Sequence, residues 1–196
     1  MSDVETWHRG DRGDWAQTYT GGRFYPLSPR AEDVDPVDIA HALAMLCRYN
    51  GHVDRFYSVA EHCLLMSLVM PTPELALEAL LHDGSEAYVG DMVSPLKHTL
   101  EMAPYRLAED YVTDAIAIRF GLLIGTDGHH SKSPEVQDAD TRILLTERTA
   151  LLSHHKPSNR WHVDGMEALD VEILALEPRA AEAAYIARLE QLGVAL

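Results

Sequence analysis

Apolar residues recur every three or four positions through most of the chain, which is the spacing of helices that bury one face. The segment 104–120 is a clear case, and Gly121 follows it as a helix-ending signal. Capping residues or first-turn prolines precede most of these segments, as in Asp35-Pro36 and Ser133-Pro134. The pattern predicts helices over about 36–48, 59–70, 73–81, 104–120, 134–152 and 178–192, and a short one starting at Ser94-Pro95.

The first 34 residues do not share this pattern. They are rich in Gly, Asp and Arg and contain one short extended candidate, residues 22–26. We therefore expect an all-α fold, a compact helical bundle with a short irregular N-terminal segment. The length of 196 residues and the 46% hydrophobic content fit one domain over residues 1–196 with a substantial core.

Charge and composition exclude several classes of protein. The formal net charge of −15 argues against binding of nucleic acid polymers, whose phosphates need a basic surface. No apolar run reaches the length of a membrane-spanning helix, so no membrane association is expected. The acidic N-terminus, residues 1–5, lacks the features of a signal peptide, and Cys47 and Cys63 are typical of reduced core residues. We expect a cytoplasmic protein.

The pair His82-Asp83, after the apolar run 76–81, is the most informative feature of the chain. His62 lies upstream and Asp140 far downstream, and both share a helix face with apolar residues. Two imidazoles and two carboxylates suit one divalent metal ion, because a buried carboxylate is costly unless it is paired or bound to a cation. Taken singly, each residue is better explained as a hydrogen-bonded core histidine or a capping aspartate. From the spacing alone, the set of four leaves the two interpretations about even.

Three further polar residues follow the His-Asp pair. Glu86 lies three positions after Asp83, hence on the same side if the helix continues, and Asp91 follows Gly90. A carboxylate beside a metal-bound water can exchange its proton, and a second can orient that water. Lys97 lies near a helix start, where anions bind. The alternatives are an acidic first-turn residue, a loop cap and a solvated lysine.

The segments 58–62, 80–87, 90–97 and 138–140 together resemble the HD-domain phosphohydrolase superfamily over about residues 36–152. The stretch 82–97 is most similar to the HD-domain 5′-deoxynucleotidases, and also to small viral dATP triphosphohydrolases and to an antibiotic-pathway enzyme that removes phosphates from nucleotides. The resemblance implies an HD-type helical bundle acting on nucleotides.

Carried over by position, the resemblance assigns a role to each candidate residue. It implies that Glu86 is the acid/base residue, that Asp91 positions the attacking water and that Lys97 contacts phosphate. The nucleotidases carry an Arg-Trp pair near sugar and phosphate, where this chain has Arg48-Tyr49, so base and sugar preference can differ. The implied metal ligands are His62, His82, Asp83 and Asp140.

The expected reaction is metal-dependent attack of water on the α-phosphorus. A 5′-deoxynucleoside monophosphate would release phosphate, and a deoxynucleoside triphosphate such as dATP would release triphosphate. The ligand set suits Mn, Co, Zn or Fe, and a triphosphate would bring an additional Mg²⁺. The resemblance also implies a homo-oligomer.

Two other functions compete with this hypothesis. A di-iron HD-type oxygenase would need extra histidines between the His-Asp pair and Asp140, and the chain offers His98, His129 and His130 there, without the usual spacing. A non-catalytic nucleotide-binding regulatory module is the second alternative. Glu86 and Asp91 beside a full ligand set argue against it.

Overall fold

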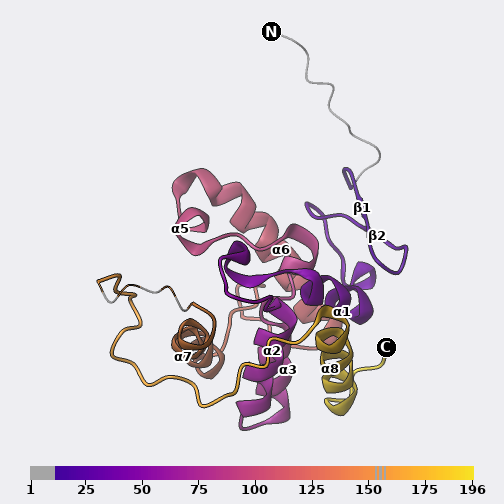
Figure 1. The fold of residues 1–196 in the computed structure, drawn as a ribbon. Helices are drawn as coiled ribbons and strands as arrows, with labels where there is room; N and C mark the ends of the chain where they lie inside the picture. The colour runs from indigo at the N-terminus through magenta and orange to yellow at the C-terminus, as the bar shows by residue number, and fades with distance from the viewer. Residues whose placement is uncertain (1–11, 153, 155, 157) are drawn as a thin grey trace.

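The structure, a computed structural model, is an all-α bundle with one two-residue antiparallel strand pair (Figure 1). It describes residues 12–152, 154, 156 and 158–196. The N-terminal residues 1–5, expected to lack a signal peptide, lie outside this part of the chain. The helices are α1 (Pro36–Met45), α2 (Val59–Val69), α3 (Pro73–Leu81), α4 (Glu86–Val89), α5 (Ser94–Lys97), α6 (Ala103–Phe120), α7 (Pro134–Leu151) and α8 (Pro178–Gln191). The strands are β1 (Ala16–Gln17) and β2 (Arg23–Phe24), and the short 3-10 helices are η1 (Ala31–Asp33), η2 (Arg48–Gly51) and η3 (Leu100–Met102).

Side-chain caps begin several helices where the sequence predicts them. In α1, α2, α3 and α7 an oxygen of the preceding residue accepts a hydrogen bond from a backbone N–H of the first turn. The first helix ends at Met45, before the expected residue 48. The chain extends there, and Cys47 forms a β-bridge with Ser58. Cys47 is therefore half-buried outside a helix, whereas Cys63 is buried within α2, and both are free thiols.

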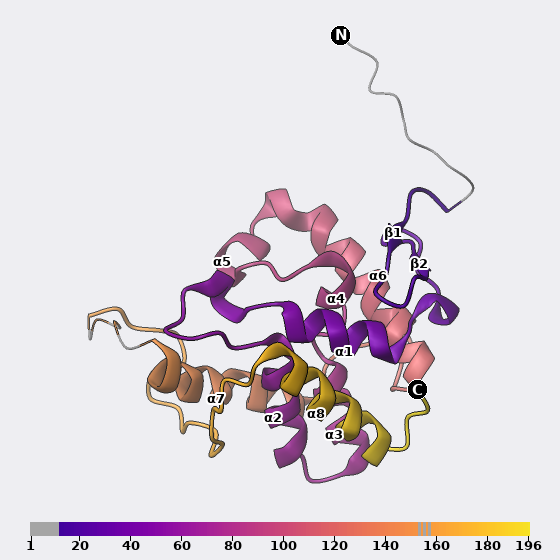
Figure 2. The same ribbon diagram turned by 45° about the vertical axis from the view of Figure 1, so that its right-hand side comes forward.

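Helix α2 lies at the centre of the bundle (Figures 1 and 2). It contacts α1, α3, α7 and α8, and every residue from position 59 to position 67 is buried. A helix surrounded in this way is apolar on all sides, which explains why its sequence shows no polar face. Three buried polar residues, Glu61, His62 and Ser67, interrupt this apolar run, so each needs a partner inside the protein.

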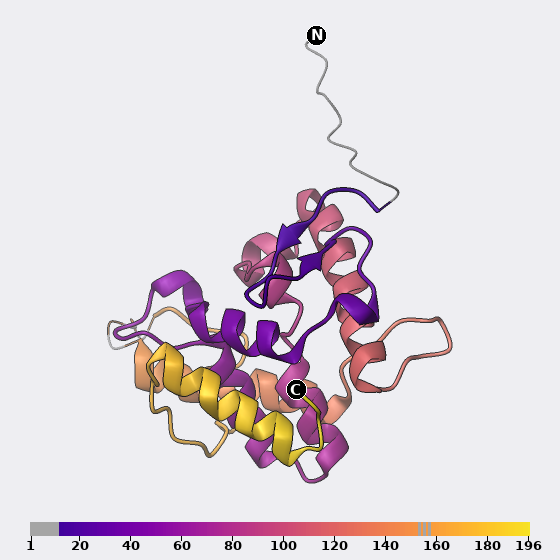
Figure 3. The ribbon, with the colours of Figure 1, turned by 90° about the vertical axis from the view of Figure 1, so that its right-hand side faces the viewer.

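Close packing between the turn after α3 and helix α6 requires a glycine at position 84. A Cβ on Gly84 would lie 2.9 Å from the backbone oxygen of Leu81 and 3.2 Å from Cδ1 of Ile116. The close approach fixes the turn that carries residues 82–86 against α6. Beyond α6, the connection to α7 projects away from the helices as a loop (Figure 3).

The Glu61 carboxylate binds the segment that leads into α8 through hydrogen bonds. Its Oε1 accepts hydrogen bonds from the backbone N–H groups of Leu174 and Ala175, both at 2.9 Å, and Oε2 accepts one from Leu176 at 2.6 Å. Ala175 has a φ of 54°, a left-handed conformation that is unfavourable for alanine. The carboxylate holds this strained segment against α2.

No helix in the described part of the chain combines the length and apolar character that crossing a membrane requires.

We expect Glu61→Gln to lower the free energy of unfolding by roughly 2 kcal/mol, because an amide NH₂ would then face at least one of the three backbone N–H groups. Urea unfolding followed by circular dichroism measures the change. Glu190→Gln, at an exposed position on α8, is the control and should change stability little. A Glu61→Gln protein as stable as this control would contradict the anchoring role.

Candidate metal centre

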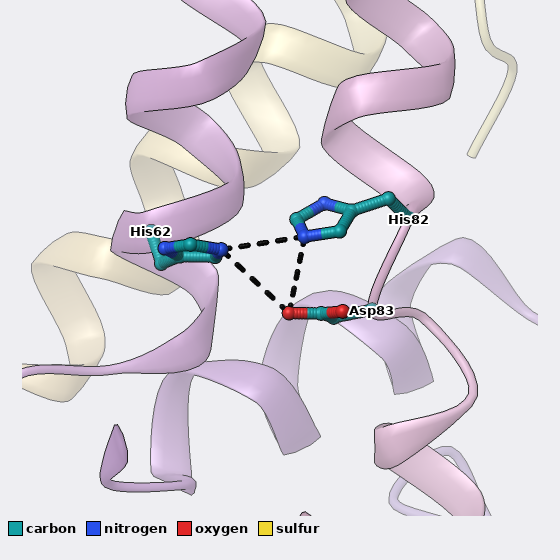
Figure 4. A group of neighbouring side chains, drawn as sticks. All are labelled: His62, His82 and Asp83. Atoms are coloured by element: carbon teal, nitrogen blue, oxygen red, sulfur yellow. Dashed lines mark hydrogen bonds and ion pairs between the residues drawn. The ribbon is translucent and has the colours of Figure 1, made fainter. Parts of the chain in front are cut away.

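Two histidines and one aspartate meet where the start of α2 packs against the end of α3 (Figure 4). Nε2 of His62 lies 3.3 Å from Nε2 of His82, and Oδ2 of Asp83 lies 3.1 Å from the latter and 3.7 Å from the former. Both imidazoles are buried. Within the described residues, these three form the one group of histidines, cysteines and acidic residues whose donor atoms are close enough to hold a metal ion together.

Asp140 of α7 lies beside the same point. Its Oδ1 is 3.5 Å from Nε2 of His62 and 3.8 Å from Nε2 of His82. Asp140 thus comes to the group from α7, which is distant in sequence from the consecutive helices α2 and α3. The donor atoms of His62, His82 and Asp83 lie close enough together to hold one metal ion, and the Asp140 carboxylate lies beside them.

The atoms of these side chains that face away from the centre are also engaged. Nδ1 of His82 lies 2.8 Å from the backbone oxygen of Ala79, and Nδ1 of His62 lies 2.6 Å from Oε1 of Glu147. A carbonyl oxygen accepts only from an N–H, so the proton of neutral His82 is on Nδ1 and its Nε2 is free to bind a metal.

Lys132 connects the two carboxylates through their outer oxygens. Its Nζ lies 3.0 Å from Oδ2 of Asp140 and 3.7 Å from Oδ1 of Asp83. Burial disfavours the charged form of Asp83, but the neighbouring His82 and Lys132 outweigh it and hold the pKa of Asp83 well below its ordinary value. The ammonium group balances the negative charge of the two carboxylates. Oδ2 of Asp83 and Oδ1 of Asp140 still face the histidines.

Glu86, the predicted acid/base residue, is buried at the start of α4. Its Oε2 has no hydrogen-bond partner among the described residues. Burial, followed by the charges of Asp83 and Asp91, raises the pKa of Glu86 to about 9. The raised pKa favours the protonated carboxyl group, which can donate a proton.

The other predicted catalytic and phosphate-binding residues lie on the segment that follows α4. Asp91 comes directly after Gly90, and burial raises the pKa of its carboxyl group. Lys97, at the end of α5, pairs with Glu109 of α6 through an Nζ–Oε1 distance of 2.6 Å. The Lys97 side chain is partly exposed, so it is in contact with solvent as well as with Glu109.

Arg48 and Tyr49, the predicted substrate-binding pair, lie beside the metal group on η2. One guanidinium nitrogen of Arg48 is 3.5 Å from Oδ2 of Asp83, and the other is 3.3 Å from Oε2 of Glu147. The Tyr49 hydroxyl donates to the same Oε2. Tyr49 and Asn50 both have left-handed backbone conformations, with φ of 55° and 54°.

The three histidines considered for a second metal make other contacts. Nδ1 of His98 is 2.9 Å from the backbone oxygen of Ser94, and Nδ1 of His129 is 2.7 Å from Oδ2 of Asp114. Nδ1 of His130 is 2.7 Å from the backbone oxygen of Leu123. None of these nitrogens belongs to the metal-capable group found among the described residues.

Sequence reasoning missed Glu147 and Lys132. Glu147 lies seven residues after Asp140, which places both on one face of α7, so the helical spacing contained a usable signal. Lys132 precedes the cap of α7 in a polar loop. Nothing in that loop indicates that its lysine folds back over the carboxylates.

We expect a divalent metal to stabilise the protein, by about 2.7 kcal/mol at a concentration 100 times the Kd. Thermal unfolding with Mn²⁺, Co²⁺, Zn²⁺ or Fe²⁺ measures the effect. Asp83→Asn should remove it, whereas Asp138→Asn, which changes an exposed neighbour of Asp140 on α7, should preserve it. Equal stabilisation of the two variants would contradict this site.

Lys132→Met should destabilise the metal-free protein, because two neighbouring carboxylates lose their shared cation. The same variant should bind a divalent ion more tightly, since the ion then meets no competing positive charge. The stabilisation produced by saturating Mn²⁺ should therefore exceed that of the wild type. An equal or smaller effect would show that Lys132 does not balance the charge of this site.

No protein-family model matches the sequence. The chain is 34% identical over 179 residues to YfdR of Escherichia coli K12, a protein described as uncharacterized, and the match covers 90% of this chain and 94% of YfdR. It is also 39% identical over 116 residues to an uncharacterized protein of Rhodobacter capsulatus, a match that covers 55% of this chain and 59% of the relative. The extent of the first match shows that the chain belongs to the same family as YfdR.

Proposed function

We propose that this protein is an HD-domain phosphohydrolase that uses one divalent metal ion to hydrolyse nucleotides. The observation that carries the proposal is the convergence of His62, His82, Asp83 and Asp140 from α2, the end of α3 and α7. A nitrogen and oxygen ligand set of this kind is typical of hydrolytic metal centres. The buried Glu86, whose Oε2 has no hydrogen-bond partner in the described part of the chain, supports an acid/base reaction at this position.

A metal held by these four residues would polarise a phosphoryl oxygen and lower the pKa of a water molecule. Asp91 would orient the attacking water toward phosphorus. Glu86, whose pKa is raised by burial, would donate a proton to the departing 5′ oxygen as the phosphorus–oxygen bond breaks. Arg48 and Lys97 would balance the negative charge on the phosphate oxygens.

The proposed substrates are 5′-deoxynucleotides. Attack of water on the α-phosphorus of a monophosphate yields nucleoside and inorganic phosphate. The same attack on a triphosphate such as dATP yields nucleoside and triphosphate, with an additional Mg²⁺ on the substrate. Arg48, which would bind phosphate, lies beside the metal group, where its guanidinium faces Asp83. The homo-oligomeric state and the cytoplasmic location implied by the sequence stay predictions.

A hydrolase is favoured over a di-iron oxygenase by the positions of the additional histidines. His98 and His129 direct a ring nitrogen to Ser94 and Asp114, respectively. A second iron would need at least two further ligands near the first, and the described residues contain a single metal-capable group.

The direct test is a panel of ribo- and deoxynucleoside mono-, di- and triphosphates with Mn²⁺, Co²⁺, Zn²⁺ or Mg²⁺. We expect metal-dependent hydrolysis that favours 5′-deoxynucleotides. Chromatography should separate nucleoside, phosphate, pyrophosphate and triphosphate, and thereby identify which phosphorus is attacked. Nucleotide binding without turnover under every metal would instead favour the regulatory module, and oxygen uptake with two irons per chain would favour the oxygenase.

We expect Glu86→Gln to lower kcat by about 10² to 10⁴, because glutamine cannot donate a proton to the leaving oxygen. The Kd for Mn²⁺ should stay within about threefold of wild type, since Glu86 is not among the proposed ligands. Steady-state kinetics on the best substrate of the panel and a Mn²⁺ titration measure the two effects. Wild-type turnover in Glu86→Gln would remove the acid/base assignment; Glu190→Gln provides the control.

A further inference from the structure

Glu147 is the most extensively paired buried carboxylate beside the metal group. It lies on α7, is fully buried, and contacts side chains from three other parts of the chain. Oε1 is 2.6 Å from Nδ1 of His62 and accepts a hydrogen bond from the Tyr57 hydroxyl at 3.0 Å. Oε2 accepts from the Tyr49 hydroxyl and from Arg48. Both oxygens are thus used, and each faces a different part of the site.

The Oε1 atom of Glu147 determines which ring nitrogen of His62 is free to bind a metal. An ionised carboxylate only accepts hydrogen bonds, so the imidazole nitrogen facing it must carry a proton. With the proton on Nδ1, a neutral His62 has its free electron pair on Nε2, the nitrogen that faces His82 and Asp83. Arg48 lies 3.3 Å from Oε2 of the same carboxylate, and a guanidinium partner favours its ionised form.

The Oε2 side of the same carboxylate holds the η2 turn. Two consecutive non-glycine residues, Tyr49 and Asn50, adopt left-handed conformations there, which are unfavourable unless surrounding contacts maintain them. The hydrogen bonds from Tyr49 and Arg48 to Glu147 supply such contacts. They also hold the Arg48 guanidinium 3.5 Å from Oδ2 of Asp83.

We propose that Glu147 is a positioning residue that fixes the tautomer and ring orientation of His62 and ties this metal ligand to the Arg48–Tyr49 turn. The inference rests on the proposed metal centre and adds to it a residue that touches neither metal nor substrate. Partners of this kind orient metal-binding histidines, and their removal typically weakens metal binding 10- to 100-fold.

If Glu147 had a purely structural role, its substitution would lower stability without weakening metal binding. Glu61 serves as the comparison for such a role. Both are buried glutamates that contact α2 or belong to it, and both accept several hydrogen bonds. The partners of Glu61, however, are backbone N–H groups of residues 174–176, and none of them is an imidazole. A loss of stability is expected for either residue, but only Glu147 should affect metal binding strongly.

The experiment measures the Zn²⁺ Kd of the full-length protein by competition with a chromophoric chelator. We expect Glu147→Gln to raise the Kd about 10- to 100-fold, because a neutral amide is a weaker and less selective partner for Nδ1–H. Glu61→Gln should unfold at lower urea concentration yet keep the Kd within about threefold. A folded Glu147→Gln protein with wild-type Zn²⁺ affinity would overturn the proposal, and so would an equal loss of affinity in Glu61→Gln. A wild-type protein that binds none of Zn²⁺, Mn²⁺, Co²⁺ and Fe²⁺ would instead refute the metal centre itself.

A second measurement on the wild type does not depend on whether the variant folds. In the Zn²⁺-loaded protein labelled with ¹⁵N-histidine, nuclear magnetic resonance should place the His62 proton on Nδ1 and the metal on Nε2. Slow exchange of that proton with solvent would agree with its hydrogen bond to a buried carboxylate. A His62 ring that carries its proton on Nε2 and binds Zn²⁺ through Nδ1 would overturn the proposal.

Discussion

Charged groups are costly to bury, and the centre of this bundle contains several of them. Asp83, Asp140 and Glu147 come together between α2, α3 and α7, where burial alone would disfavour their ionised forms. Arg48 and Lys132 are the cations that compensate them. Arg48 bridges Asp83 and Glu147, whereas Lys132 bridges Asp83 and Asp140, so the charges form one connected network.

The helical framework explains why this network can exist at all. Helix α2 is buried along most of its length and carries His62 into the centre of the protein. The packing of α3 and α7 against it brings a carboxylate from each side, and the close approach at Gly84 fixes the turn that carries Asp83. A second contact fixes each of these side chains on the side opposite its donor atom. His82 contacts a backbone oxygen, His62 contacts Glu147, and both aspartates contact Lys132. Ligands constrained in this way lose little freedom when they bind an ion.

The sequence was most informative where a physical pattern repeats locally. Apolar spacing and capping residues predicted the helices, and they failed at residue 45, where the chain leaves α1 to pair Cys47 with Ser58. His62 and Asp140 share their helix faces with apolar residues, so their inward orientation could be predicted from the sequence. Lys132 could not, because its position depends on how a polar loop folds back over α7 rather than on any periodicity. The match to YfdR covers 90% of the chain but assigns no chemistry, because YfdR is itself described as uncharacterized.

The proposed chemistry depends on one divalent metal ion that binds between α2, α3 and α7. A crystal grown with Mn²⁺ tests this through anomalous diffraction at the manganese edge. We expect one strong peak per chain, about 2.0 to 2.3 Å from Nε2 of His62, Nε2 of His82, Oδ2 of Asp83 and Oδ1 of Asp140. Occupied manganese sites elsewhere, with no peak among these four atoms, would contradict it.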